Sequence, residues 1–261
     1  MEIIRYPALD PYRERYAEMG MEPLEIEVEL HNALAGYDPL FLDNLLANCV
    51  VNDATGGKGV PNTEDAYVLP VPLRALWRDA QGLPLWAASQ FWPDGACYDQ
   101  IAYWHKRAQS GVWTGNKRGS FTITSTKGRY MERRVPMPTR LAERWRAWCI
   151  GNAEEIGRLL EPLTHIGKRR SIGYGEVHRW IIRPVSEFSL IRDGCLTRSI
   201  PAMAIAWDAP YWHAGMMPEG EPAPVGWTPP QWKPSLFAPG WWLGTPVKSI
   251  ASWYDAASNL G

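Results

Sequence analysis

The segment from residue 167 to residue 175 has the composition of a turn that could surround phosphate groups. Its candidate contact residues combine glycines, basic side chains and two hydroxyl groups: Gly167, Lys168, Arg169, Arg170, Ser171, Gly173, Tyr174 and Gly175. Successive backbone N–H groups in a glycine-rich turn bind anions, and arginine adds a bidentate fork of donors. Tyr174, between two glycines, could stack on a nucleobase, a contact worth about 1–3 kcal/mol. The spacing alone fits a solvated basic turn equally well, so both interpretations stay open.

Three better-known motifs do not explain this segment. The order GxxxxGK[ST] of a P-loop does not occur in the chain. A dinucleotide-binding loop opens a helix after a strand, whereas this segment lies between a predicted helix and a following strand. Ser171 is not in a GxSxG elbow, which a serine hydrolase would need.

Metal-independent RNA cleavage is a second possible chemistry. It would need a general base for the 2′-OH, an acid for the leaving oxygen and cations for the phosphate. Among the five histidines, His105 is the best candidate base because two basic residues, Lys106 and Arg107, follow it. Tyr174 with an arginine of the glycine-rich segment is an alternative set. No catalytic residue is favoured, and His105 stays a candidate only.

The spacing of the Cys, His and Glu residues does not indicate a metal or cofactor site. The cysteines lie far apart, without a CxxC pair or a histidine at ligand spacing: Cys49, Cys97, Cys149 and Cys195. Glu25, Glu27 and Glu29 alternate with apolar residues, which is typical of the solvated face of a strand. We therefore expect no metal and no cofactor.

Charge is distributed unevenly along the chain. The formal net charge is −1, which does not support a free-standing nucleic-acid binder. Basic residues nevertheless dominate residues 106–146 and 167–183. Residues 98–127 are basic, aromatic and glycine-punctuated, and predict a projecting hairpin or mobile loop. Four of its cations are further candidate contacts: Lys106, Arg107, Lys117 and Arg118. With no secretory signal and no apolar run of about 18 residues, we expect a cytoplasmic protein without a membrane partner.

Hydrophobic periodicity predicts the elements that must position these segments. Strands are expected at 24–30, 66–73, 84–91, 129–138 and 176–184. Helices are expected from an N-cap at Asp38 to Cys49, over 138–149, and over 153–165 with Pro162 able to shorten the last. After residue 195 the many prolines predict an extended, irregular tail that packs through four tryptophans: Trp227, Trp232, Trp241 and Trp242.

The order of these elements predicts an α+β, ferredoxin-like fold. Two helices would cover one face of an antiparallel sheet, leaving the other face free for RNA or for insertions. We divide the chain into an N-terminal arm (1–22), a ferredoxin-like domain (23–195) with an insertion at about 92–128, and a Trp/Pro-rich extension (196–261).

Two segments resemble a known family. The run from His165 to Val177 resembles the glycine-rich loop of the RAMP superfamily, the RRM-like proteins of CRISPR effector complexes. The run from Pro39 to Leu46 is similar to the start of such subunits. Together they most resemble the type IV CRISPR subunit that acts as the fifth Cas family, with the resemblance covering residues 24 to about 185.

The resemblance implies a crRNA-binding subunit in antiviral or anti-plasmid defence. Such a subunit grips the 5′ handle of the guide RNA, caps the backbone filament and helps to place the large subunit beside target DNA near the PAM. It implies backbone and large subunits as partners, with a DinG-family helicase as a further one, and makes residues 98–127 a thumb. Two alternatives stay open: a metal-independent crRNA-processing endoribonuclease of the same superfamily, and a protein-interaction module with no RNA role.

Overall fold

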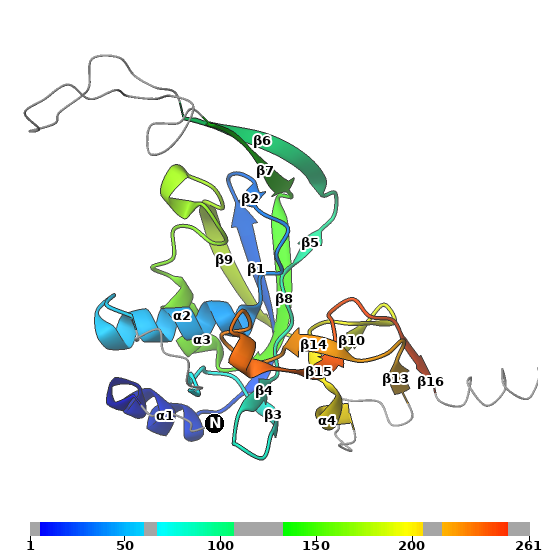
Figure 1. Cartoon of the computed structure of the whole chain (residues 1–261). Helices are drawn as coiled ribbons and strands as arrows, with labels where there is room; N and C mark the ends of the chain where they lie inside the picture. The colour runs from blue at the N-terminus through cyan, green and yellow to red at the C-terminus, as the bar shows by residue number, and fades with distance from the viewer. Residues whose placement is uncertain (1–5, 60–66, 107–132, 206–215, 250–261) are drawn as a thin grey trace, which may run out of the picture.

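The computed structural model describes residues 6–59, 67–106, 133–205 and 216–249. The fold is α+β, with several antiparallel sheets and few helices (Figure 1). The largest sheet has four strands, each antiparallel to its neighbours. Their order across the sheet is β5 (Trp92–Asp94), β8 (Arg144–Gly151), β1 (Glu22–Leu30) and β9 (Val177–Pro184).

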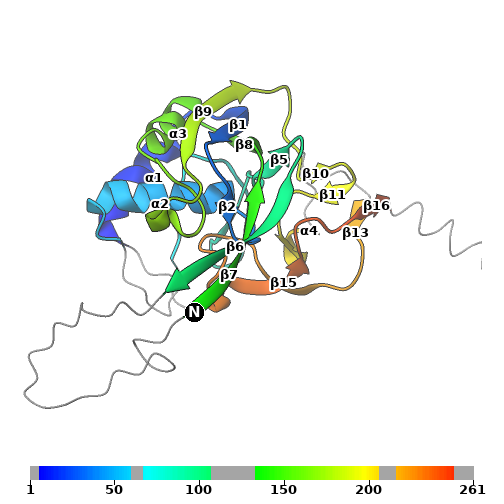
Figure 2. The same cartoon turned by 90° about the horizontal axis from the view of Figure 1, so that it is seen from above.

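The central strand β1 follows the predicted alternation. Leu24, Ile26 and Val28 are completely buried in a core that also contains residues of α2 (Leu42–Thr55) and α3 (Ala153–Leu160). Burying each such side chain stabilises the fold by roughly 1.5–3 kcal/mol. Seen from above, both helices lie on the same side of the sheet (Figure 2). The opposite face carries the glutamates of β1, and that face is described with the candidate site.

Both predicted helices that form have boundaries different from those expected. α3 begins where the Asn152 side chain accepts the Glu155 N–H at 2.9 Å, and it ends at Leu160 because Pro162 cannot continue it. α2 begins later than predicted, with Phe41 rather than Asp38 at its N-cap. It ends where Gly56 adopts the left-handed conformation (φ 59°).

The helix predicted over 138–149 is wrong. Those residues instead belong to β7 (Arg133–Leu141) and β8. Trp145, Ala147 and Cys149 are fully buried, while the alternate residue Arg146 lies on the opposite face of the sheet. Leu141, Trp145 and Trp148 have helical spacing, whereas Trp145, Ala147 and Cys149 alternate with a period of two, and pairing with β1 selects the strand.

Two other predicted strands are shorter than expected. Between residues 67 and 73 only Leu73 makes a bridge, to Gly151, because the prolines at 70 and 72 lack ladder donors. The regular strand starts later, as β3 (Ala75–Arg78), which pairs with β4 (Pro84–Trp86). The apolar run 84–91 continues after β4 only as isolated bridges.

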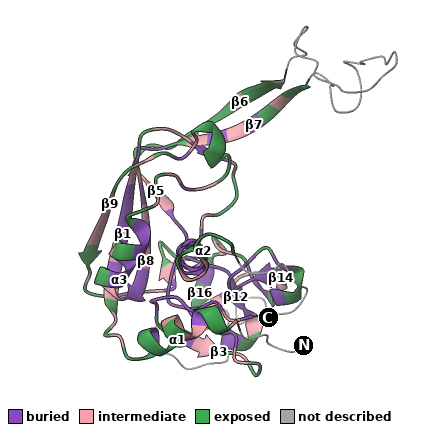
Figure 3. Cartoon of the chain, turned by 90° about the vertical axis from the view of Figure 1, so that its left-hand side faces the viewer, coloured by how far each residue is buried: buried purple, intermediate pink, exposed green. Residues whose placement is uncertain are grey.

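A long two-stranded ribbon projects from the body of the molecule (Figure 3). β6 (Tyr98–Lys106) pairs along its length with β7, and the two-residue β2 (Leu34–Ala35) pairs with the other edge of β7. The hairpin expected over 98–127 is therefore confirmed in its first strand. Residues 107–132 lie outside the described residues.

The region after residue 195 is more regular than its prolines suggest. It contains α4 (Ala202–Ile205), the turn η4 (Pro234–Leu236) and short antiparallel strands: β11 (Cys195–Leu196), which pairs with the preceding β10 (Ile191–Arg192), then β12 (Ile200–Pro201), β13 (Met216–Pro218), β14 (Ala223–Gly226), β15 (Phe237–Trp241) and β16 (Val247–Ser249). Pro224 and Pro239 face each other across one ladder, where neither residue has an N–H to donate. The expectation of an irregular extension is thus wrong over most of the described part.

A second hydrophobic core explains this order. Trp227 and Trp241 are buried in it, together with Leu76 and Leu85 from the β3–β4 hairpin. The predicted packing is correct for these two tryptophans and wrong for the other two, because Trp232 and Trp242 are 62% and 47% exposed.

The N-terminal residues pack against the first core. A 3₁₀ turn, η1 (Pro7–Leu9), leads into α1 (Asp10–Ala17), and Leu9 and Tyr16 are buried. Glu155 of α3 accepts a hydrogen bond from the Tyr16 hydroxyl at 2.7 Å. No helix among the described residues is long and apolar enough to cross a membrane.

Candidate functional site

The glycine-rich segment is a loop closed at its base by backbone hydrogen bonds. The Ile166 N–H donates to the Gly175 carbonyl at 2.8 Å, and the Gly175 N–H donates to the Ala33 carbonyl at 3.0 Å. Below this closure, the Val177 N–H donates to the Thr164 carbonyl at 2.8 Å. Ile166 is completely buried and anchors the base in the core. The loop between Gly167 and Tyr174 is therefore held at both ends.

Two backbone positions determine the loop's shape. Gly175 has φ 67°, and a Cβ added there would overlap the Ile166 carbonyl oxygen, so only glycine fits. Arg169 is one of two non-glycine residues with positive φ among the described residues, at 59°. Such a conformation costs a non-glycine residue of order 1–3 kcal/mol and is retained where the surroundings enforce it.

The cations of the loop point into solvent. Lys168, Arg169 and Arg170 are all exposed, and Lys168 forms an ion pair with Asp38. Within the described part of the chain, the guanidinium groups of Arg169 and Arg170 make no hydrogen bond or ion pair. Tyr174 is half-buried, so its ring is fixed more firmly than the arginines. The loop thus presents two uncompensated positive charges beside a partly anchored aromatic ring.

The short strand β2 joins this loop to the projecting ribbon. Ala35 forms a bridge with Lys168 and also pairs with Thr139 of β7. Asp38 adds a second connection, because its carboxylate pairs with Lys168 and its carbonyl accepts a hydrogen bond from Arg140 Nη2 at 3.2 Å. Figure 1 shows the loop before β9 and the root of the ribbon at the same end of the sheet. Two segments far apart in sequence are therefore joined through β2 and Asp38.

The ribbon carries exposed aromatic residues on both faces. Tyr103 is 47% and Trp104 44% exposed, and neighbouring residues in a strand point to opposite faces. The Arg134 guanidinium lies 4.0 Å from the centre of the Tyr103 ring, where it is attracted to the ring face. His105 shares this face, with its ring centre 6.4 Å from that of Tyr103.

Of the four cations predicted in the ribbon segment, the described residues include Lys106. Lys106 is the last residue of β6, opposite Arg133 of β7. Arg107, Lys117 and Arg118 lie outside the described residues. The ribbon therefore supplies His105 and Arg134 to the surface near its tip, and the thumb expected from the sequence is described only up to residue 106 and again from residue 133.

The uncovered face of the main sheet is an ion-pair ladder. Arg146 Nε donates to Glu27 Oε2 at 2.9 Å, and Arg179 makes two hydrogen bonds of 2.7 Å to Glu29. Burial alone would raise the pKa of Glu27, but hydrogen bonds from Arg146 and Arg183 outweigh it and lower that pKa. Glu27 is only 1% exposed, so the prediction of a solvated face is wrong for this residue. Because its charges are compensated internally, this face is less suited to bind phosphate than the loop.

A pair of histidines at the foot of the loop was not expected from the sequence. His31 Nε2 and His178 Nδ1 are 3.2 Å apart. The sequence signal was available, since His31 directly follows one predicted strand and His178 lies at the start of another. Pairing of those two strands brings the rings together. Among the described residues, no group of three or more His, Cys, Asp or Glu side chains lies close enough to hold a metal ion.

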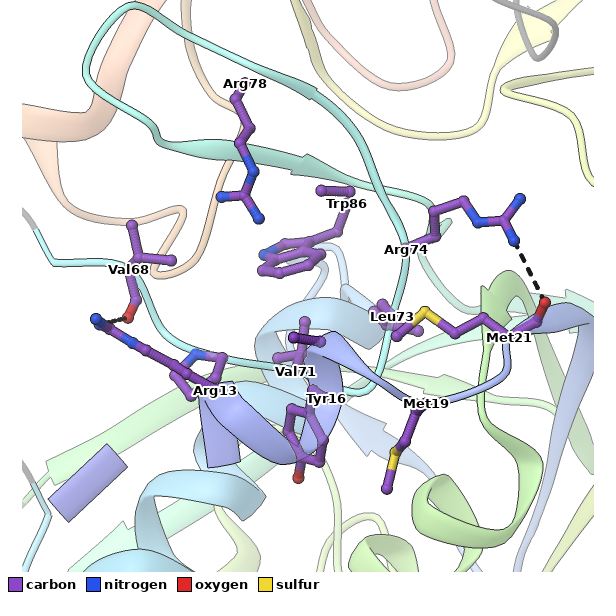
Figure 4. Close-up of a pocket in the computed structure, with 13 residues that line it drawn as sticks. Arg13, Tyr16, Met19, Met21, Val68, Val71, Leu73, Arg74, Arg78 and Trp86 are labelled. Atoms are coloured by element: carbon purple, nitrogen blue, oxygen red, sulfur yellow. Dashed lines mark hydrogen bonds between the residues drawn. The ribbon is translucent and has the colours of Figure 1, made fainter. Parts of the chain in front are cut away.

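In the described part of the chain, one cavity lies away from the loop and another adjoins its base. One, of about 540 Å³, is lined by α1 and residues 68–86 and contains Arg13, Arg78 and the ring of Trp86 (Figure 4). The other, of about 510 Å³, lies between α3 and β9 and is lined partly by His178 and Trp180. The second cavity adjoins the histidine pair and therefore the base of the glycine loop.

One known protein family matches most of the chain. Residues 22–218 match the family described as CRISPR type IV associated protein Csf3. The matched range includes the four-stranded sheet, the glycine-rich loop and the described part of the ribbon. Comparison with curated proteins gives no match. Since the match covers well over half of the 261 residues, the chain belongs to the Csf3 family of type IV CRISPR-associated proteins.

Proposed function

We propose that this chain is the crRNA-binding subunit of a type IV CRISPR effector complex. Family membership supports a place in such a complex. The structural observation that carries the RNA assignment is the clamped glycine loop with two uncompensated guanidinium groups, joined through β2 to an aromatic and basic ribbon. Phosphates would lie against the loop, and unstacked bases against the ribbon.

The strand order supports a ferredoxin-like, RAMP-type arrangement as part of this proposal. Taken along the chain, β1, β5, β8 and β9 are the first to fourth strands of the sheet, and they lie in the order second, third, first, fourth. α2 follows the first strand and α3 the third, as in a βαββαβ unit. In this arrangement the loop before β9 occupies one end of the sheet, beside the end of β1.

The proposed RNA-binding residues of the loop act in different ways. Arg169 and Arg170 contribute charge and bidentate donors to phosphate oxygens. Tyr174 supplies a stacking surface, and the backbone around Gly173 comes close to the sugar–phosphate chain. Lys168 contributes through its ion pair with Asp38, which positions it. The described ribbon residues, with Arg107, Lys117 and Arg118 beyond them, form the thumb in this proposal.

A wider role in the complex is part of the same proposal. We place the subunit in the cytoplasm at the 5′ handle of the guide, where it caps the backbone filament and contacts the large subunit near the PAM. Base pairing by the guide, not this chain, then reads the target. The same proposal includes a DinG-family helicase as a partner of the assembled complex. A net charge of −1 suits a subunit whose basic surface is local and whose remaining surface meets protein.

Binding of the purified chain to labelled repeat RNA tests this function. The double change Arg169→Ala and Arg170→Ala removes two phosphate donors without altering the glycines. We expect weaker binding and a salt dependence reduced by up to about 1.4 in log–log slope, since each single-strand phosphate contact contributes about 0.7. A matched control, Arg192→Ala with Lys248→Ala, removes two cations from the C-terminal part.

Equal affinity and slope in the two double variants would contradict the proposed RNA site and favour a protein-interaction module.

The same assay without metal addresses the nuclease alternative. Site-specific cleavage abolished by His105→Ala would make the chain a processing enzyme, whereas intact RNA agrees with a binding subunit.

A further inference from the structure

His31 and His178 contact each other at the foot of the glycine loop. The two facing ring nitrogens are 3.2 Å apart, and the ring centres are 4.6 Å apart with planes inclined at 61°. Both side chains are exposed, so burial does not force the contact. The sole group that each facing nitrogen meets at hydrogen-bond distance, within the described part of the chain, is the other imidazole.

A β-bulge brings the two rings together. Between Glu29 and Leu30 the register of β1 against β9 shifts, so that His178 is the extra residue on β9. Bulges redirect side chains and are common beside functional sites. Just beyond β1, the His31 N–H donates to the Glu176 carbonyl at 2.9 Å, which fixes the second histidine in place. The contact is therefore built by the fold, from two different strands.

The next residue ties the pair to the loop. Asn32 Nδ2 donates to the Gly173 carbonyl at 2.7 Å, and its Oδ1 accepts the Glu176 N–H at 3.1 Å. Asn32, the residue after His31, therefore holds the C-terminal end of the loop in place through Gly173 and Glu176. An RNA strand lying along Arg169 and Arg170 would pass close to both imidazoles.

The number of protons on the pair decides what it can bind. A contact between two imidazole nitrogens needs one N–H donor and one free lone pair, so at most one of the facing nitrogens carries a proton. One further proton, on the facing nitrogen that had accepted, leaves no acceptor between the rings, and the contact must open. Two N–H groups then converge on the same space, which suits an anion with two oxygens, such as a phosphodiester.

The surrounding charges leave room for this anion. The charged groups around the pair are Glu29 on β1, Arg144 on β8, Arg179 on β9 and Glu176 at the end of the loop. Glu29 is already neutralised by two hydrogen bonds from Arg179, and Arg144 also acts on it. Glu176 shares its carboxylate with Asn32 at 3.4 Å. The carboxylates near the histidines are thus engaged by other groups.

We propose that His31 and His178 form a second, proton-dependent phosphate site that extends the glycine loop. This inference rests on the proposed RNA-binding function. Histidine titrates near neutral pH, so RNA binding would take up about one proton as the shared contact opens. One linked proton changes the affinity by at most tenfold per pH unit. Lower pH would therefore tighten RNA binding through these two residues.

RNA affinity measured from pH 7.5 to pH 5.5 at constant ionic strength tests the site. The wild-type chain is compared with His31→Gln, His178→Gln and the double variant, and with His165→Gln as a control beside the loop. We expect a pH-linked gain of about tenfold in the wild type and the control. Each single variant should lose it as fully as the double variant, because the two rings act as a unit.

Three outcomes separate the claims. The same pH dependence in the wild type and the double variant would overturn the histidine site while leaving the loop assignment standing, provided that Arg169→Ala with Arg170→Ala still weakens binding. An absence of RNA binding at every pH would overturn both. A pH-linked gain that persists in either single variant would overturn the claim that the two rings act as a unit.

Discussion

Arg198 Nη2 and Asp43 Oδ2 form an ion pair of 2.9 Å in the interior of the protein. The side chains are 1% and 0% exposed, and they join the region after residue 195 to the first turn of α2. Arg198 also donates to the carbonyl groups of Trp86, Ala88 and Trp227. The second carboxylate oxygen of Asp43 accepts a hydrogen bond from Gln231 at 2.9 Å. The pair therefore fastens the C-terminal region to the body of the protein.

Removing one member of this pair should be strongly destabilising. Arg198→Met leaves the Asp43 carboxylate buried without its cation, and breaking a buried pair typically costs about 3–5 kcal/mol. Urea unfolding should show this loss in the free energy of unfolding. The exposed pair of Lys248 and Glu219 is the matched control, and Lys248→Met should cost less than about 1 kcal/mol.

The double change Arg198→Met with Asp43→Leu distinguishes charge from packing. Without either charge, no buried ion is left unpaired, so the double variant should be more stable than Arg198→Met alone. A double variant that is less stable than the single one would mean that the hydrogen bonds that Asp43 accepts from Gln231 and from the Asn44 N–H outweigh the cost of its unpaired charge.

Gly175→Ala should destabilise the loop base far more than Gly173→Ala. Both glycines have positive φ, at 67° and 91°, but only at Gly175 would the new methyl overlap a backbone oxygen. The cost at Gly173 should be about 1–3 kcal/mol from backbone strain, and the cost at Gly175 should exceed it. Thermal unfolding of both variants measures the difference. Equal losses would mean that the base opens readily, contrary to its three backbone hydrogen bonds.

Tyr103 on the ribbon should contribute to RNA affinity by stacking. Tyr103→Ala is expected to weaken binding by about 1–3 kcal/mol for one stacked base. Because no charge is removed, the slope of affinity against salt should stay constant. Tyr103→Phe retains the ring under Arg134 and should bind like the wild type. Fluorescence anisotropy with labelled RNA measures both quantities, and a loss in the phenylalanine variant would assign the effect to the hydroxyl instead.

Acid should weaken the contact between α1 and α3 through Glu155. Burial raises the pKa of this carboxyl, but hydrogen bonds from Arg158 and Tyr16 outweigh it, so the pKa is lower folded than unfolded. The unfolded chain therefore takes up the proton at a higher pH. The resulting stability is present above the ordinary glutamate pKa of about 4.3 and is lost as the pH falls through the folded pKa.

Comparison with Glu155→Gln measures this contribution. The wild type should be more stable at pH 7 by roughly 1.5–3 kcal/mol, as for a hydrogen bond to a charged group. The difference should shrink as the pH falls below about 4.3. A difference that is constant with pH would show that the glutamine keeps the same contacts and that the charge is irrelevant.

The sequence predicted correctly the elements whose pattern is complete within a few neighbouring residues. The alternation of β1, the apolar stripe of α3 and the glycines around Lys168 are each complete within a few residues. The β8 region was misassigned because its apolar residues fit two periods, and only its pairing with β1 distinguishes them. The second core was missed because it unites residues near 80 with residues beyond 188.

In the candidate site too, local composition was predictable from the sequence, whereas contacts between distant segments were not. Composition identified the glycine loop, but its closure at Ile166 and its union with the ribbon through Ala35 depend on long-range pairing. The histidine contact depends on a bulge at His178, which no local pattern signals. The charge compensation of Glu27 likewise requires the register of three strands.

The strand β2 connects the projecting ribbon with the glycine loop. It has two residues, yet Ala35 pairs with the ribbon on one side and with Lys168 on the other. The ribbon begins beside this strand (Figure 1). A displacement of β7 would reach Lys168 of the glycine loop through Ala35, which pairs with both. If the loop binds RNA and the ribbon meets another subunit, as proposed, Leu34 and Ala35 would therefore connect the two contacts.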